Sequence, residues 1–105
     1  MNVTFEYDYL KELFESGATK GKKYRFQPHI VKSYQKVVKI LLAALTIEEL
    51  WKFKSLHYEV LVGDKKGISS VKINDQYRLE FEVFQNKDDI LLTVCNILEI
   101  SNHYS

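Results

Sequence analysis

The sequence predicts an α+β fold in which two helices pack on a mostly antiparallel sheet. Three observations support this class: one short strand pattern opens the chain, helical patterns follow it, and four strand patterns fill the second half. Helices followed by a run of strands form separate layers, because each element must bury an apolar face against another. The 105 residues, of which 46% are hydrophobic, fit a single domain over 1–105 with one core.

The chain begins with a strand and a short helix. Apolar and polar residues alternate over 3–7, which indicates a strand. Asp8 is a candidate N-cap for a helix over 9–16, because its carboxylate can accept free backbone N–H bonds. Gly17 stands where a left-handed residue would end that helix.

The longest helix is predicted over 29–45. Its apolar residues fall in one broad arc at 3.6 residues per turn, and Pro28 suits the first turn. A further helical turn follows, in which Thr46 and Glu49 have the spacing of a capping box. Between 16 and 47 the chain has basic residues and no acidic ones, so this part can form a local anion-binding surface.

The second half reads as strands joined by turns. Residues 55–62 form the first strand candidate, and Gly63 and Gly67 bracket a basic loop after it. Residues 86–89 form a polar turn, and the apolar run 90–98 predicts a strand that is covered on both faces.

A hairpin between the loop and the polar turn carries the main functional signal. A three-residue turn at 74–76 pairs Val71 with Leu79 and keeps apolar side chains on one face. The same register places Lys72 directly across from Arg78. Two like charges opposite one another are unfavourable. A sequence that keeps both, away from the core, indicates an anionic partner such as a phosphate.

Several classes of chemistry lack sequence support. The lone Cys95 excludes an internal disulfide and is expected to be inert core, while His29, His57 and His103 lack the spacing of metal ligands. The chain has no dinucleotide, P-loop, zinc-protease or serine-hydrolase motif. It shows no signal peptide and no apolar run that could span a membrane, so a cytoplasmic location is expected.

The remaining candidates are basic and aromatic residues. Cations beside a scissile phosphate stabilise developing charge, a histidine transfers protons, and an aromatic ring stacks an unpaired base. No metal or other cofactor is needed if the nucleophile is a ribose 2′-hydroxyl. The candidates are Arg78, Lys72, His103 and Tyr104 for catalysis, and Lys65, Lys66, Lys32, Lys36 and Lys39 for substrate binding.

Each candidate also has a structural interpretation. Lys72 and Arg78 would either belong to a solvated sheet face or pair with Glu80 and Glu82. The histidine and tyrosine near the end of the chain would belong to a frayed tail. The helical lysines would form an ordinary helix exterior.

The same residues resemble a known family. Gly-Asp-Lys-Lys-Gly at 63–67, Ser-Val-Lys at 70–72 and Tyr-Arg at 77–78 resemble the RelE/ParE toxin superfamily, in particular its HigB-like branch. Leu-Phe-Glu-Ser-Gly at 13–17 and Asn-His-Tyr at 102–104 are similar to further pieces of that branch.

The resemblance implies a curved sheet and the toxin of a type II toxin–antitoxin pair, with a small helix-turn-helix antitoxin as partner. It implies a ribosome-dependent mRNA interferase that cleaves by metal-independent 2′-hydroxyl attack. In that scheme Arg78 binds the scissile phosphate, Lys72 stands where the branch has an arginine, and His103 and Tyr104 serve proton transfer and base stacking.

Besides Lys72, the chain departs from the branch at two positions and in the order of its tail, His103-Tyr104, where many relatives end in Tyr-His. Glu59 and Val62 occupy positions where many relatives have a histidine and a lysine. The alternatives are therefore a ParE-like toxin that inhibits DNA gyrase by protein contact, or a toxin without cleavage activity that acts as a binding module.

Overall fold

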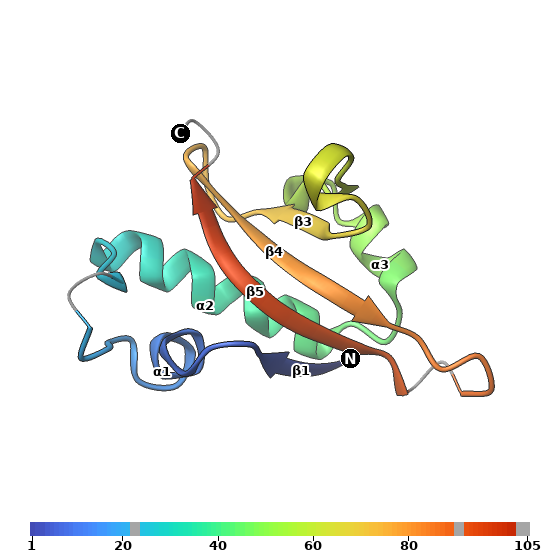
Figure 1. Ribbon diagram of the computed structural model, residues 1–105, viewed down its shortest axis with the longest axis horizontal. Helices are drawn as coiled ribbons and strands as arrows, with labels where there is room; N and C mark the ends of the chain where they lie inside the picture. The colour runs from blue at the N-terminus through green and yellow to red at the C-terminus, as the bar shows by residue number, and fades with distance from the viewer. Residues whose placement is uncertain (22–23, 90–91, 103–105) are drawn as a thin grey trace.

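The computed structural model describes residues 1–21, 24–89 and 92–102 and confirms the α+β class. One strand and two main helices precede the remaining strands (Figure 1). The elements are β1 (Asn2–Phe5), α1 (Asp8–Ser16), α2 (Pro28–Ala43), α3 (Ile47–Lys52), η2 (Lys54–Leu56), β2 (Glu59–Val60), η3 (Gly63–Lys65), β3 (Ser69–Lys72), β4 (Tyr77–Phe84) and β5 (Val94–Asn102). No helix in these ranges is long and apolar enough to cross a membrane.

The strands form one mixed sheet in the order β1-β5-β4-β3-β2. Only β1 and β5 are parallel among these pairs, so the sheet is mostly antiparallel as predicted. Figure 1 shows β4 and β5 as long, curved strands with α2 running behind them. The sheet therefore has one face covered by helices and one face that points away from them.

The core lies between the sheet and α1 and α2. Leu10 and Leu13 of α1 meet the apolar arc of α2, in which Tyr34 and Val38 are fully buried. The Tyr34 hydroxyl donates to the backbone carbonyl of Leu10 at 2.7 Å, so the buried polar atom has a partner. The sheet contributes Val71, Leu79, Phe81, Cys95 and Ile97 to this core.

The hairpin has the predicted register. Val71 pairs with Leu79, and Lys72 stands across from Arg78. The turn is closed by the Asn74 side chain, whose Oδ1 accepts the backbone N–H of Gln76 at 2.9 Å and that of the following residue at 2.7 Å. An asparagine is suited to this turn because its side chain can bind its own backbone two and three residues on.

A β-bulge in β5 was not predicted. Glu80 pairs with Glu99, but the next residue of β4, Phe81, pairs with Ile97, so Leu98 is the extra residue. The bulge shifts the alternation by one, which turns Ile100 toward the core and Glu99 away from it. Both Glu80 and Glu99 therefore lie on the face that points away from the helices.

The predicted helix ends need corrections. The long helix α2 covers Pro28–Ala43 and not 29–45. Asp8 is the first residue of α1 rather than its cap, although an acidic residue in the first turn still favours the helix dipole. Glu49 reaches back to the N–H of Leu45 at 2.9 Å and not to Thr46, so the expected capping box does not form. Gly17 is left-handed with φ of 77° and ends α1 as predicted.

Two predicted strands begin later than expected. Residues 55–62 contain only the short strand β2, because η2 and a left-handed His57 occupy its first half. In the apolar run 90–98 the strand begins at Val94, while Ile90 and Leu91 lie outside the described residues. Hydrophobicity alone did not reveal either shortening, since a short apolar run also suits 3₁₀ turns.

Candidate active site

Arg78 lies on the sheet face opposite the helices, called the outer face below. Its neighbour Leu79 is fully buried on the other side, because side chains alternate along a strand. Arg78 stands across from Lys72 on β3 and Ser101 on β5. The adjacent row of cross-strand partners consists of Glu59, Ser70, Glu80 and Glu99.

The guanidinium of Arg78 is held by the protein itself. Its Nε donates to the Ser70 hydroxyl at 2.6 Å, and its Nη2 donates to the backbone carbonyls of His57 at 2.7 Å and Ser70 at 3.1 Å. The same Nη2 lies 3.5 Å from the Glu59 carboxylate. With 12% of its side chain exposed, Arg78 has a fixed orientation before any ligand binds. Among the described residues, none bonds to its Nη1.

His57 supports this arrangement through its backbone. Among the described residues, His57 is the one non-glycine residue with a positive φ; its φ is 45° and its ψ is 51°. This left-handed conformation at the end of η2 directs its carbonyl to Arg78. A non-glycine residue in this region is uncommon and is often found at functional sites. The sequence showed only that His57 lacks the spacing of a metal ligand, and it did not reveal this backbone role.

Lys65 is engaged by two carboxylates. Its ammonium lies 2.9 Å from Glu80 and 2.8 Å from Glu99, which the β-bulge places side by side. Hydrogen bonds to these two carboxylates raise the pKa of Lys65 above its ordinary value. The hydrogen bond from Lys65 holds the pKa of Glu99 below its ordinary range. Lys65 thus offsets the repulsion between two acids that face each other across strands.

Lys72 is paired within the hairpin turn. Its ammonium lies 2.8 Å from the carboxylate of Asp75, whose side chain is 92% exposed. The hydrogen bond from Lys72 lowers the pKa of Asp75 from its ordinary value. The predicted partners Glu80 and Glu82 are not the ones that Lys72 and Arg78 use.

The other predicted residues are spread more widely. Lys66 is exposed on the loop after η3, and Lys32, Lys36 and Lys39 are exposed along α2, in the helical layer. Lys36 lines a pocket that Lys72 also lines, but no contact joins these helical lysines to Arg78. His103 and Tyr104 lie outside the described residues; β5 is described up to Asn102, which pairs with Tyr77.

Cys95 is not a nucleophile in this fold. It is fully buried, as predicted, and burial raises the pKa of its thiol to about 11. A thiol in that state is inert at neutral pH, because the thiolate is the reactive form.

The outer face around Arg78 is not strongly cationic. Within the described ranges, its ion pairs join Lys65, Lys72 and Arg78 to Glu59, Asp75, Glu80 and Glu99, so carboxylates outnumber cations. Sequence reasoning found the cations but missed most of their partners. The signal for Lys72 was present, since Asp75 follows it at a spacing of three within the turn.

The fold is that of the RelE/ParE-like toxins. The solved structure of the YoeB/ParE toxin from Agrobacterium tumefaciens matches 99% of this chain and 100% of its own, with a TM-score of 0.57 and 13% sequence identity. Such a low identity shows the fold alone. No curated protein sequence gives a significant match.

The family follows from the sequence as a whole. The model of the RelE-like toxin of type II toxin–antitoxin system HigB matches residues 3–96, so the chain belongs to the HigB-like toxin family. Membership of a type II system implies a partner antitoxin. The family resemblance of the hairpin motif is thereby confirmed.

Proposed function

We propose that the chain is an endoribonuclease that cuts translated mRNA on the ribosome, with Arg78 at the scissile phosphate. The observation that carries this proposal is the fixed guanidinium of Arg78, whose Nε and Nη2 are held by Ser70 and His57 while its Nη1 bonds to none of the described residues. A planar guanidinium binds phosphate oxygens in a defined geometry. Orientation before binding is what electrostatic stabilisation of a transition state requires.

The proposed reaction is intramolecular attack within RNA. The 2′-hydroxyl oxygen bonds to the adjacent phosphorus as the bond from phosphorus to the 5′-oxygen breaks, which leaves a 2′,3′-cyclic phosphate and a 5′-hydroxyl. A base takes the proton of the 2′-hydroxyl, and an acid protonates the leaving oxygen. Arg78 stabilises the negative charge that develops on the phosphate, so the scheme requires no metal or other cofactor.

The proton-transfer groups in this proposal are His103 and Glu59. Glu59 has an exposed carboxylate 3.5 Å from Arg78, in the place where many relatives have a histidine. A carboxylate beside the phosphate-binding arginine is positioned to accept the 2′-proton. Tyr104 is assigned to base stacking, and Lys66 with Lys65 and Lys72 to the flanking phosphates.

The test is cleavage of mRNA on translating ribosomes by the purified protein. Wild-type protein should produce cuts that end in cyclic phosphate, and Arg78→Ala should abolish them. Arg78→Lys should also lose most activity. Lysine keeps the positive charge, but it lacks the planar guanidinium that Ser70 and His57 hold in place. Arg25→Ala is the matched control, since Arg25 is exposed and lies outside the site. Intact mRNA with the wild-type protein would overturn the proposal. Cleavage of free RNA as fast as of mRNA on the ribosome would show that the activity does not depend on the ribosome.

A second candidate function is inhibition of DNA gyrase by protein contact. The observation that favours it is the pairing of Lys65, Lys72 and Arg78 with carboxylates, which leaves little free positive charge for RNA on the outer face. A supercoiling assay separates the two functions. Inhibition of gyrase by protein that leaves mRNA intact would support this second function.

The partner and location complete the proposal. We assign the chain a small helix-turn-helix antitoxin and a cytoplasmic site of action, where ribosomes and mRNA are found. Co-expression with each adjacent gene should yield a stable, non-toxic complex with one of them. Toxicity that persists with every neighbour would contradict this assignment.

A further inference from the structure

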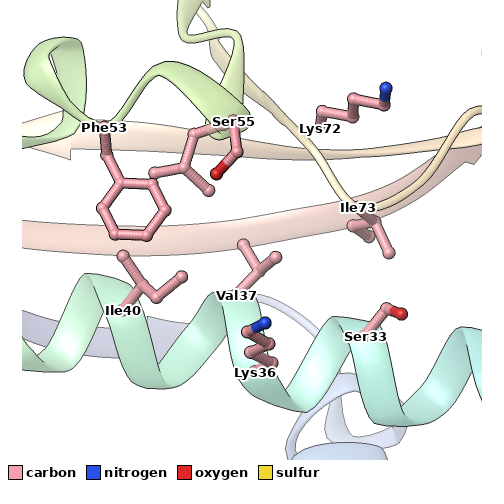
Figure 2. Close-up of a pocket in the computed structure, with 9 residues that line it drawn as sticks. Ser33, Lys36, Val37, Ile40, Phe53, Ser55, Lys72 and Ile73 are labelled. Atoms are coloured by element: carbon pink, nitrogen blue, oxygen red, sulfur yellow. The ribbon is translucent and has the colours of Figure 1, made fainter.

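A groove runs between α2 and the segment that contains α3 and η2. Two adjoining pockets share Ile40 and Phe53 and hold about 230 Å³ each. We call them together the α2–α3 groove, defined by Val37, Ile40, Ala43, Leu50, Phe53 and Leu56. Figure 2 shows the ring of Phe53 facing Ile40, with Val37 beside it on α2.

The groove exposes apolar surface on the helical side of the protein. Phe53 is 46% exposed although it is a large aromatic residue, and Ile40 is only partly buried. The exposed apolar surface of the groove comes from Ile40, Ala43 and Phe53, whereas Val37, Leu50 and Leu56 are buried. Each pocket is smaller than the roughly 300–1,000 Å³ of an ordinary small-molecule site. The groove therefore suits a row of side chains from another protein better than it suits a small molecule.

Five exposed lysines, called the lysine rim below, lie on the elements that form the groove, and Lys36 among them lines it. Lys36 lines it on α2, between the exposed Lys32 and Lys39, and Lys52 and Lys54 lie on the segment that forms the opposite wall. In the parts of the chain that the structure describes, no ion pair involves any of these five lysines. The acidic residue that lines the groove, Glu49, is at the far end and accepts the N–H of Leu45.

We propose that the α2–α3 groove binds an amphipathic helix of another protein, with its apolar stripe on Ile40 and Phe53 and its flanking carboxylates on the lysine rim. The backbone groups of α2 already bond within the helix, so a docking segment gains affinity from side chains. That is the mode in which an amphipathic helix lies in a groove. The apolar side chains that Ile40 and Phe53 expose favour a protein over RNA, because apolar side chains give phosphate groups no hydrogen-bond donor.

This binding site is distinct from the proposed RNA site. The groove belongs to the helical layer, whereas Arg78 lies on the outer face. Lys72 lines the groove as well, but Figure 2 shows its ammonium pointing away from α2, and Asp75 holds it. The experiment therefore leaves Lys72 unchanged.

The test uses the full chain and a fluorescent peptide designed as an amphipathic helix, with leucines at helical spacing flanked by glutamates. Anisotropy should show saturable binding to the wild type. Phe53→Asp should weaken it by about tenfold or more, which corresponds to about 1.4 kcal/mol. Lys36→Glu should also weaken it, and a peptide with lysines in place of the glutamates should recover binding to that variant. Lys87→Glu, in the polar turn at 86–89, is the matched control for charge reversal.

Three outcomes would overturn the proposal. The first is no binding of the acidic peptide by the wild type, or binding that Phe53→Asp leaves unchanged. The second is stronger binding of a single-stranded RNA, lost in Phe53→Asp, which would assign the groove to nucleic acid. The third is a wild-type dimer in light scattering that Phe53→Asp converts to monomer, which would assign the groove to a second copy of the chain.

Discussion

Arg78 binds Ser70 twice, since its Nε donates to the serine hydroxyl at 2.6 Å and its Nη2 donates to the serine carbonyl at 3.1 Å. Ser70 is 1% exposed, so its hydroxyl has no ready access to water. The serine thus sets the direction of a guanidinium that stands across from Lys72. This pairing makes the geometry of the candidate site dependent on a small, buried polar residue.

Ser70→Ala should lower both stability and activity. The substitution leaves Nε of Arg78 without its acceptor at a nearly buried position, which costs about 1–3 kcal/mol. Urea unfolding measures that loss, and mRNA cleavage should fall because the guanidinium is no longer fixed. Ser33→Ala on α2 is the control. Unchanged stability and cleavage in Ser70→Ala would refute the positioning role.

Asp75→Asn should tighten RNA binding by releasing Lys72. The carboxylate that now holds the ammonium at 2.8 Å is lost, and Lys72 becomes free for a phosphate. One added phosphate contact steepens the slope of log affinity against log salt by about 0.7 for single strands. Anisotropy with a single-stranded RNA over a salt series measures this slope. Asp88→Asn is the control, and a slope equal to that of the wild type would count against the role of Lys72.

Lys65→Met should change how stability depends on pH. In the folded chain the pKa of Glu99 lies below its ordinary 4.5, so its pairing with Lys65 stabilises the fold above pH 4.5 and is lost as the pH falls through the folded pKa. The pKa of Lys65 lies above its ordinary 10.5, so its contribution is complete below pH 10.5 and is lost as the pH rises through the folded pKa.

Between these limits Lys65→Met should unfold at lower urea than the wild type, because Glu80 and Glu99 then face each other without a cation. The difference in urea midpoint between the two proteins should narrow in acid, where Glu99 becomes protonated. Urea unfolding of both proteins over a pH series measures this difference, with Lys66→Met as the control. A difference in urea midpoint that does not depend on pH would show that the loss of the Lys65 charge is not the cause of the destabilisation.

Gly67→Ala should destabilise the loop that carries Lys65. Gly67 has φ of 88°, and a Cβ added there would meet nothing within 4 Å, so the cost is conformational and not steric. A left-handed conformation of a residue with a Cβ costs about 1–2 kcal/mol. Thermal or urea unfolding measures it. Gly21→Ala should be nearly neutral by comparison, since Gly21 lacks a positive φ.

The hairpin could be predicted because its determinants are local. Period-two alternation and a three-residue turn fix which residues of β3 and β4 face each other, and they gave the Lys72–Arg78 pair correctly. The long helix was equally clear, since Pro28 and the apolar arc of α2 lie within one segment. Both elements are decided by residues close together in sequence.

The partners of the cations could not be predicted, because they come from distant parts of the chain. Lys65 meets Glu99 across 34 residues, and only through the β-bulge at Leu98 does that carboxylate lie on the outer face. The bulge left a trace in the sequence: Ile97 and Ile100 are three apart, where regular alternation would separate core residues by two. The bond from Arg78 to the backbone carbonyl of His57 could not be predicted from residue types, because every residue has a backbone carbonyl.

The parallel pairing of β1 with β5 affects the order in which the protein can assemble during its synthesis. Thr4 stands beside Asn96, so the first strand of the sheet has no partner until the last strand has been made. β5 also supplies Glu99 to Lys65 and Ser101 to the neighbourhood of Arg78. A nascent chain that lacks β5 therefore has neither a continuous sheet nor a complete outer face. Under the proposed function, this order of assembly would keep each new molecule inert for most of its own translation.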